Sequence, residues 1–82
     1  MNITFKLFAS LATYLPDHAK DNAVEIEIDS ETTPNQLIER YHLPEREVHL
    51  VLKNGVFLQP SDRDVPLKHL DVLAIWPPVA GG

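Results

Sequence analysis

The sequence predicts an α+β fold in which one main helix packs on a mixed sheet of about five strands. Three observations lead to this fold class. Short apolar segments with the period of a strand recur along the chain, one segment of helical periodicity stands between them, and the expected folded part begins and ends with an apolar strand. The 82 residues are enough for one small domain, which we expect to span residues 1–76.

The first half of the chain predicts a hairpin. Ile3, Phe5 and Leu7 alternate with polar residues, as in a half-buried strand. Residues 24–28 predict a second strand, with aliphatic side chains on the buried face and glutamates on the solvated face. In between, a run that begins at Phe8 places apolar residues at helical spacing, which predicts a short turn or helix.

A helix is expected after the hairpin. Residues 33–36 combine a threonine N-cap, a proline at the first helical position and a glutamine at the capping-box position. Leu37, Ile38 and Tyr41 then form an apolar stripe, and Leu43-Pro44 is expected to end the helix. A helix this short needs a sheet to pack on, because isolated short helices are marginal in water.

The second half predicts three more strands. Residues 48–53 and 56–58 are apolar and flank Asn54-Gly55, a pair that tolerates the positive φ angles of a type I′ turn. Leu67 and Leu70 are expected to pack beneath the polar connection that follows. Residues 72–76, Val-Leu-Ala-Ile-Trp, are nearly continuously apolar and predict a central strand.

The composition of the chain argues against several classes of function. A net charge of -5 with scattered basic residues disfavours a nucleic-acid partner. The chain has no cysteine, and its start, MNITFKLFASL, lacks the features of a signal peptide, so we expect a cytoplasmic protein. No apolar stretch is long enough for a bilayer span, and no membrane partner is expected. The four histidines have no metal-ligand spacing, so we expect no metal site.

The chain ends in an extended tail, residues 77–82, with the sequence PPVAGG. Pro77 and Pro78 cannot continue a strand ladder and should direct the chain outward. Gly81 and Gly82 lack a Cβ, so they can enter a channel too narrow for other residues and bring the terminal carboxylate close to a partner's backbone. The alternative is a frayed terminus without function, which is common at chain ends.

The whole chain resembles the MoaD/ThiS family of ubiquitin-like sulfur carriers. The resemblance rests on the opening ITFKLFASL, the hairpin segment VHLVLKNG, the strand DVLAIW and above all PPVAGG. It implies a β-grasp roll with the first and last strands parallel in the middle of the sheet. The double proline is closer to the small subunit of molybdopterin synthase than to the thiamine carrier. The family commonly has an Asp-Gly turn where this chain has residues 68–71, and phenylalanine is frequent at the position of Trp76.

The resemblance implies a carrier rather than an enzyme. An E1-like adenylyltransferase (MoeB/ThiF-like) would use ATP and Mg²⁺ to adenylate Gly82, and a sulfur donor would displace AMP to leave a thiocarboxylate. The sulfur would then be donated inside the large subunit of molybdopterin synthase. Gly81, Ala80, Val79 and the two prolines would carry Gly82 into each active site. No cofactor is expected on this chain itself.

Docking is assigned to an apolar patch formed by Trp76, Val79 and Phe57, for which ordinary core packing is the alternative. Three further functions stay open. The sulfur could be destined for thiamine or another product, Gly82 could be conjugated to other proteins as in a ubiquitin-like modifier, or the domain could be a plain interaction module with an inert tail.

Overall fold

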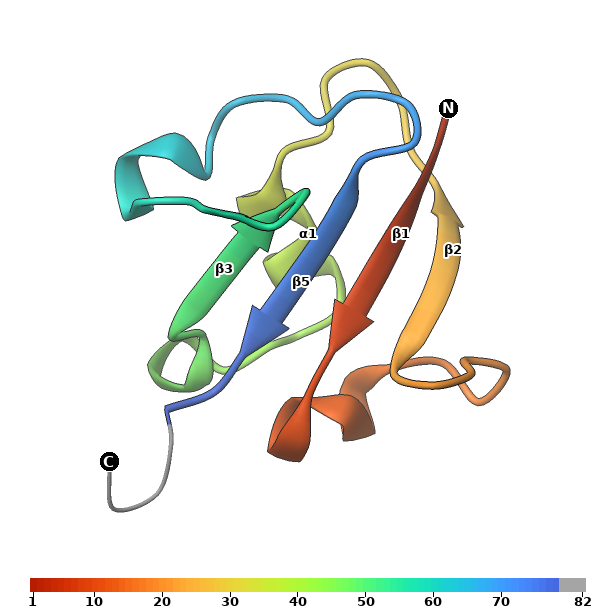
Figure 1. Ribbon diagram of the computed structural model, residues 1–82, viewed down its shortest axis with the longest axis vertical. Coiled ribbons are helices and arrows are strands. Elements are labelled where there is room, and N and C mark those ends of the chain that lie inside the picture. Colours follow the sequence, from red (N-terminus) through yellow and green to blue (C-terminus); the bar gives the residue numbers. More distant parts are fainter. Residues whose placement is uncertain (79–82) are drawn as a thin grey trace.

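The computed structural model, which describes residues 1–78, contains one five-stranded sheet, one α-helix and three short 3₁₀ helices (Figure 1). In chain order the elements are β1 (Asn2–Leu7), η1 (Ala9–Tyr14), β2 (Ala23–Glu27), α1 (Pro34–Arg40), η2 (Glu45–Glu47), β3 (Leu50–Lys53), β4 (Val56–Phe57), η3 (Pro60–Asp62) and β5 (Val72–Trp76).

The sheet has the strand order β2-β1-β5-β3-β4, so the first and last strands lie side by side in its middle. The β1–β5 pair is parallel and the other three pairs are antiparallel. This confirms the predicted mixed sheet and the predicted central position of residues 72–76. The predicted N-terminal hairpin is also confirmed, with Ile3 opposite Ile26.

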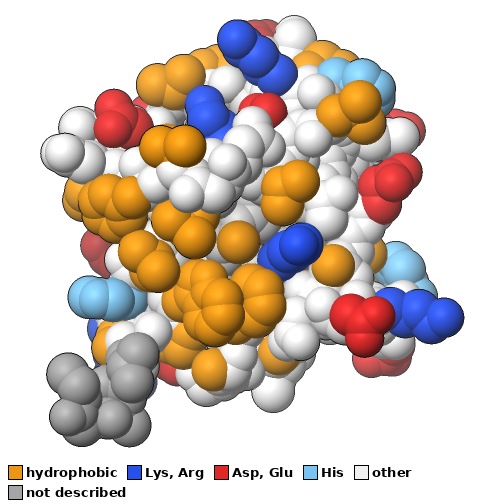
Figure 2. All heavy atoms as spheres, viewed as in Figure 1, with side chains coloured by type: hydrophobic (Ala, Val, Ile, Leu, Met, Phe, Trp, Pro, Cys, Tyr) orange, Lys and Arg blue, Asp and Glu red, His pale blue; other side chains and the backbone are white. Residues whose placement is uncertain are grey.

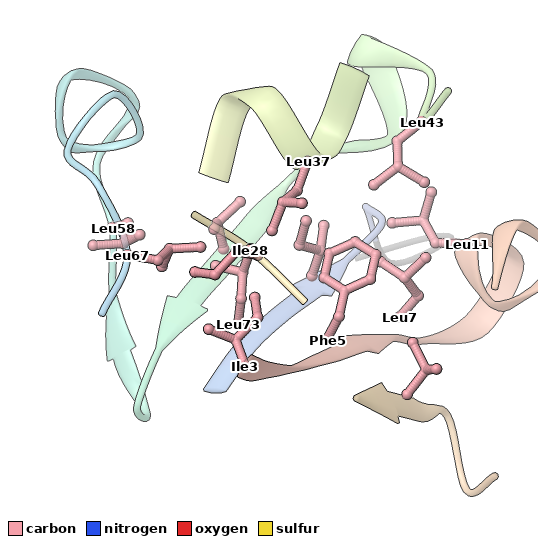
Figure 3. Packing of buried hydrophobic residues seen from close by; sticks show 13 residues of the cluster. Ile3, Phe5, Leu7, Leu11, Ile28, Leu37, Leu43, Leu58, Leu67 and Leu73 are labelled. Atoms are coloured by element: carbon pink, nitrogen blue, oxygen red, sulfur yellow. The ribbon is translucent and has the colours of Figure 1, made fainter. Parts of the chain in front are cut away.

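Helix α1 covers one face of the sheet, and the core lies between them (Figure 3). Phe5, Leu7 and Leu73 point from the two central strands toward Leu37 of the helix (Figure 3), and these four side chains and that of Ile75 are fully buried. The strict alternation of buried and half-buried residues along β1 follows from the period of two of a strand with one covered face. Within residues 1–78, no helix lies on the other face of the sheet.

The start of α1 follows the prediction. The Gln36 N–H donates to Thr33 Oγ1, and the Thr33 N–H donates to Gln36 Oε1, each over 3.2 Å, which completes a capping box. The type I′ turn is also confirmed, since Asn54 and Gly55 have φ angles of 52° and 81°.

The end of α1 differs from the prediction, because the helix stops at Arg40 rather than at Leu43-Pro44. His42 has a φ of 60°, and its N–H donates to the Glu39 carbonyl. The Leu43 N–H donates to the Ile38 carbonyl, and these two hydrogen bonds together form a Schellman motif. The motif ends the helix before the proline is reached, and the usual glycine signal is missing because a histidine occupies the left-handed position.

Three smaller corrections concern the second half. Strand β3 begins at Leu50, two residues later than predicted, because the 3₁₀ turn η2 ends only just before it. Strand β4 is shorter than predicted by one residue. Leu67 is buried as expected, but Leu70 is 73% exposed. The backbone of Leu70 has a φ of 71° and its N–H donates to the Asn2 carbonyl, and this conformation turns the side chain outward.

Candidate functional site: the tail exit and the open sheet face

The strand that leads into the tail is fixed at its first residues by a buried carboxylate. Asp71 accepts hydrogen bonds from the Lys68 N–H and from Asn54 Nδ2, over 2.8 and 2.9 Å. Asn54 Oδ1 in turn accepts from the Val72 N–H, and the Asn54 N–H donates to the Val72 carbonyl. The β3–β4 turn and the start of β5 are therefore one hydrogen-bonded unit.

This environment changes the acidity of Asp71. Burial raises the pKa of the carboxyl, but the hydrogen bonds from Lys68 and Asn54 lower it, and so do the positive charges of Lys53 and Lys68. The net result is a pKa below the ordinary value, so Asp71 holds this unit together as a carboxylate.

The other end of β5 is held from both sides. The Phe8 N–H donates to the Ile75 carbonyl over 3.2 Å, and the His49 N–H donates to the Trp76 carbonyl over 3.1 Å. Pro77 and Pro78 follow and have no N–H to continue either ladder. The tail thus leaves from the end of a central strand that is paired up to its last residue.

The indole of Trp76 lies flat on the ring of Phe8, with centroids 3.8 Å apart and planes inclined by 5°. Trp76 is nevertheless 38% exposed, and Phe57 is 49% exposed. The alternative that these two side chains belong to the core is therefore wrong, and their predicted exposure is confirmed. Their predicted role in docking stays a prediction.

Strand register places more apolar side chains on this uncovered face. Leu50 lies opposite Trp76, while Leu52 lies between Phe57 and Ala74. We call this group the open-face patch: Phe8, Leu50, Leu52, Phe57, Ala74 and Trp76. Figure 2 shows hydrophobic side chains gathered in the middle of this face, close to the exit of the tail.

Phe8 was not among the predicted site residues, because its spacing to Leu11 and Leu15 also fits the helical run that follows β1. The strand period contained the signal, because Phe8 is out of phase with Ile3, Phe5 and Leu7 and so belongs to the opposite face. Ala9, with a φ of 52°, then turns the chain into η1. The predicted site residues Val79, Ala80, Gly81 and Gly82 lie outside the described residues.

Two classes of site find no support in the described part of the chain. No group of three or more histidine, cysteine, aspartate or glutamate side chains within residues 1–78 could hold a metal ion. Among the helices of that same part, none has both the length and the apolar composition for crossing a membrane.

Known proteins resemble this chain in sequence and in fold. The model of the ThiS family matches residues 5–82. A search of curated proteins gives no match. Among solved structures, SAMP1 of Haloferax volcanii, a small archaeal modifier protein, has 26% identity and a TM-score of 0.69, with 100% of both chains covered.

Two further structures carry names from molybdopterin synthesis. A Pyrococcus furiosus protein provisionally named molybdopterin converting factor, subunit 1, has 23% identity and a TM-score of 0.66, covering 95% of this chain and 98% of its own. In a Helicobacter pylori complex of subunits 1 and 2 of molybdopterin-converting factor, one chain matches with 21% identity and a TM-score of 0.62. The match covers 100% of this protein and 100% of that chain. These likenesses confirm the predicted β-grasp fold.

Proposed function

The chain belongs to the ThiS family, and on that premise we propose that it is a sulfur carrier whose working group is the carboxylate of Gly82. The observation that carries the proposal is a family match that reaches through the final PPVAGG segment, together with a paired central strand that leads directly into this segment.

The chemistry requires an activating partner, because a free carboxylate is anionic and has no leaving group. An E1-like adenylyltransferase transfers AMP from ATP, held with Mg²⁺, to the Gly82 carboxylate and releases pyrophosphate. Sulfide supplied by a sulfur donor then attacks the acyl carbon, the bond between that carbon and the AMP oxygen breaks, and AMP leaves, which produces a thiocarboxylate. The partner supplies the catalytic groups, so the carrier itself acts as a cosubstrate rather than as an enzyme.

The described residues contribute position and a docking surface. Hydrogen bonds to Ile75 and Trp76 fix the end of β5, and the two prolines stiffen the exit toward Gly82. The open-face patch lies beside this exit, so a partner that covers the patch receives the tail at the same edge. Apolar aromatic side chains of this kind are frequent anchors in protein interfaces.

Molybdopterin synthesis is the proposed destination of the sulfur. Support comes from the double proline of the tail and from the likeness to the two molybdopterin-converting-factor structures, one of which is a complex of subunits 1 and 2. On this proposal the large synthase subunit holds the pterin precursor that accepts the sulfur. Thiamine or another sulfur-containing product is the alternative destination.

The test is the intact mass of the protein purified from its own cells, compared with a variant that lacks Gly82. We expect a mass gain equal to the exchange of one oxygen for sulfur, and we expect the deletion to abolish it. An unmodified mass after incubation with the cognate adenylyltransferase, ATP, Mg²⁺ and a sulfur donor would contradict the sulfur-carrier proposal.

A second function is a protein modifier conjugated through Gly82, which the likeness to SAMP1 favours. The same activation by adenylation serves both functions, so the tail does not separate them. Gel electrophoresis under denaturing conditions does: conjugates of higher mass that survive denaturation and disappear on deletion of Gly82 would establish the modifier.

A further inference from the structure

The uncovered face of the sheet is divided by charge. Over β3, β4 and β5 it carries the open-face patch, and over β2 it carries the exposed glutamates Glu25 and Glu27. Lys6 of β1 lies on the boundary between these two parts, because its cross-strand neighbours are Ala74 on the apolar side and Ala23 on the acidic side. Figure 2 shows a basic side chain at the border of the central hydrophobic cluster.

The ammonium of Lys6 faces no acidic side chain directly across the sheet, and Glu25 of β2 lies only diagonally across from it. Neither alanine beside it carries a side-chain acceptor, and no side-chain hydrogen bond within residues 1–78 involves Lys6. The side chain is half-buried, so its stem lies along the face while water solvates its charged end.

A partner that covers the open-face patch also removes water from Lys6. Leaving a charged group buried without a counter-charge is strongly unfavourable, whereas a carboxylate placed against it offsets the loss of solvation. We propose that Lys6 selects the protein that docks on this face: the partner presents an aspartate or glutamate to Lys6 inside an otherwise apolar contact. The inference rests on the proposed function, which requires such docking.

The occupant is a different protein rather than a second copy of this chain. Each chain carries a net charge of -5, so two copies repel each other, and a face-to-face pair would bring the glutamates of both β2 strands to the same contact. A partner with an apolar surface and a single acidic group fits both the patch and the charge at its border.

The experiment uses the full chain with two probes, the adenylyltransferase and the large synthase subunit from the same organism. We expect Lys6→Glu to weaken binding to at least one of them by tenfold or more, because like charges then meet in the contact. Lys6→Arg should retain binding within about threefold, since it keeps the charge. Arg40→Glu is the matched control: it makes the same charge change at an exposed position of α1, on the opposite side of the sheet.

A carbodiimide, which joins an amine to a carboxylate in contact with it, provides the second measurement. We expect an amide bond between Lys6 and an acidic residue of the partner, found by mass spectrometry of the digested complex. The proposal is overturned if Lys6→Glu and Arg40→Glu bind equally well, or if Lys6 links only to a second copy of this chain.

Failure of this inference is distinguishable from failure of the proposed function. If the wild-type chain gains the thiocarboxylate while Lys6→Glu binds both probes normally, the carrier function stands and the role of Lys6 is wrong. If the wild-type chain gains no sulfur and binds neither probe, both are wrong.

Discussion

The two faces of the sheet are built from the same strands but differ in the kind of side chain and in burial. On the covered face, Leu73 and Ile75 of β5 are fully buried against α1. On the open face, Ala74 and Trp76 of the same strand lie beside Leu52 and Leu50, and the indole is partly in water. The covered face therefore supplies the stability of this small domain, while the open face keeps apolar surface that the fold does not use.

The largest expected effect on stability comes from phenylalanine, which occurs on both faces of the sheet. Phe5 is 0% exposed and packs against Tyr41 with ring centroids 5.0 Å apart, whereas Phe57 is 49% exposed. Phe5→Ala should lower the free energy of unfolding by about 3–5 kcal/mol because it leaves a cavity. Phe57→Ala should lower it by about 1 kcal/mol or less.

Urea denaturation measures both variants, with far-ultraviolet circular dichroism and the fluorescence of Trp76, the single tryptophan, as probes. The affinity for the large synthase subunit should rank the two variants the other way round. Phe57→Ala should lower it about tenfold or more, and more than Phe5→Ala does. Equal losses of stability for the two variants would show that the open face belongs to the folding core.

A smaller effect on stability is expected at Asp71, which joins the β3–β4 turn to the start of β5. Because the pKa of Asp71 is lowered in the folded state, its contribution to stability is complete above the ordinary pKa of an aspartate, about 4. The contribution is lost as the pH falls through the folded-state value. We therefore expect the free energy of unfolding to decrease below about pH 4.

The matched variant is Asp71→Asn, which should cost about 1–2 kcal/mol at neutral pH because it loses one of the two hydrogen bonds that the carboxylate accepts, from the Lys68 N–H or from Asn54 Nδ2. Its acid dependence should be weaker than that of the wild type. It should not vanish, because the pKa of Asp29 is also lowered, first by a hydrogen bond from the Glu31 N–H and then by one from Thr32. Denaturation curves collected between pH 2 and 7 test this, and parallel pH profiles would contradict it.

The smallest expected effect is a gain. Leu70 has a left-handed backbone conformation with a φ of 71° and exposes 73% of its side chain. Leu70→Gly should raise the free energy of unfolding by about 0.5–1 kcal/mol, since glycine adopts this conformation without a steric penalty. Leu70→Ala keeps the strain and serves as the control, with an expected change within about 0.5 kcal/mol. A thermal unfolding midpoint that is equal or lower for the glycine variant would refute the strain at this position.

Local structure could be predicted from the sequence where the local chemistry agrees with the fold. The capping box of Thr33 and Gln36, the turn at Asn54-Gly55 and the alternation of β1 each predict one local structure, and all three are present. The end of α1 and the exposure of Leu70 could not be predicted. Both depend on left-handed backbone conformations at residues other than glycine, which only the surrounding hydrogen bonds impose.

The candidate site, too, has parts that could be predicted from the sequence and parts that could not. The tail was recognisable because two prolines and two glycines have strong backbone preferences, and the exposure of Phe57 and Trp76 was one of two open alternatives. Phe8 and Lys6 were not singled out. Their meaning depends on the register of β1 against β5, which brings them beside Trp76 and Ala74 from the other end of the chain.

The parallel pairing of β1 with β5 also affects the order of events during synthesis. The ribosome produces β1 first, but its central neighbour is complete only when residue 76 has been added. Until then the inner edge of β1 is unpaired and Phe5 lacks its neighbour Leu73 on β5, so we expect a nascent chain that stalls early to stay unfolded. Folding thus waits for the segment that immediately precedes the tail, because a shorter chain lacks the central β1–β5 pair of the sheet.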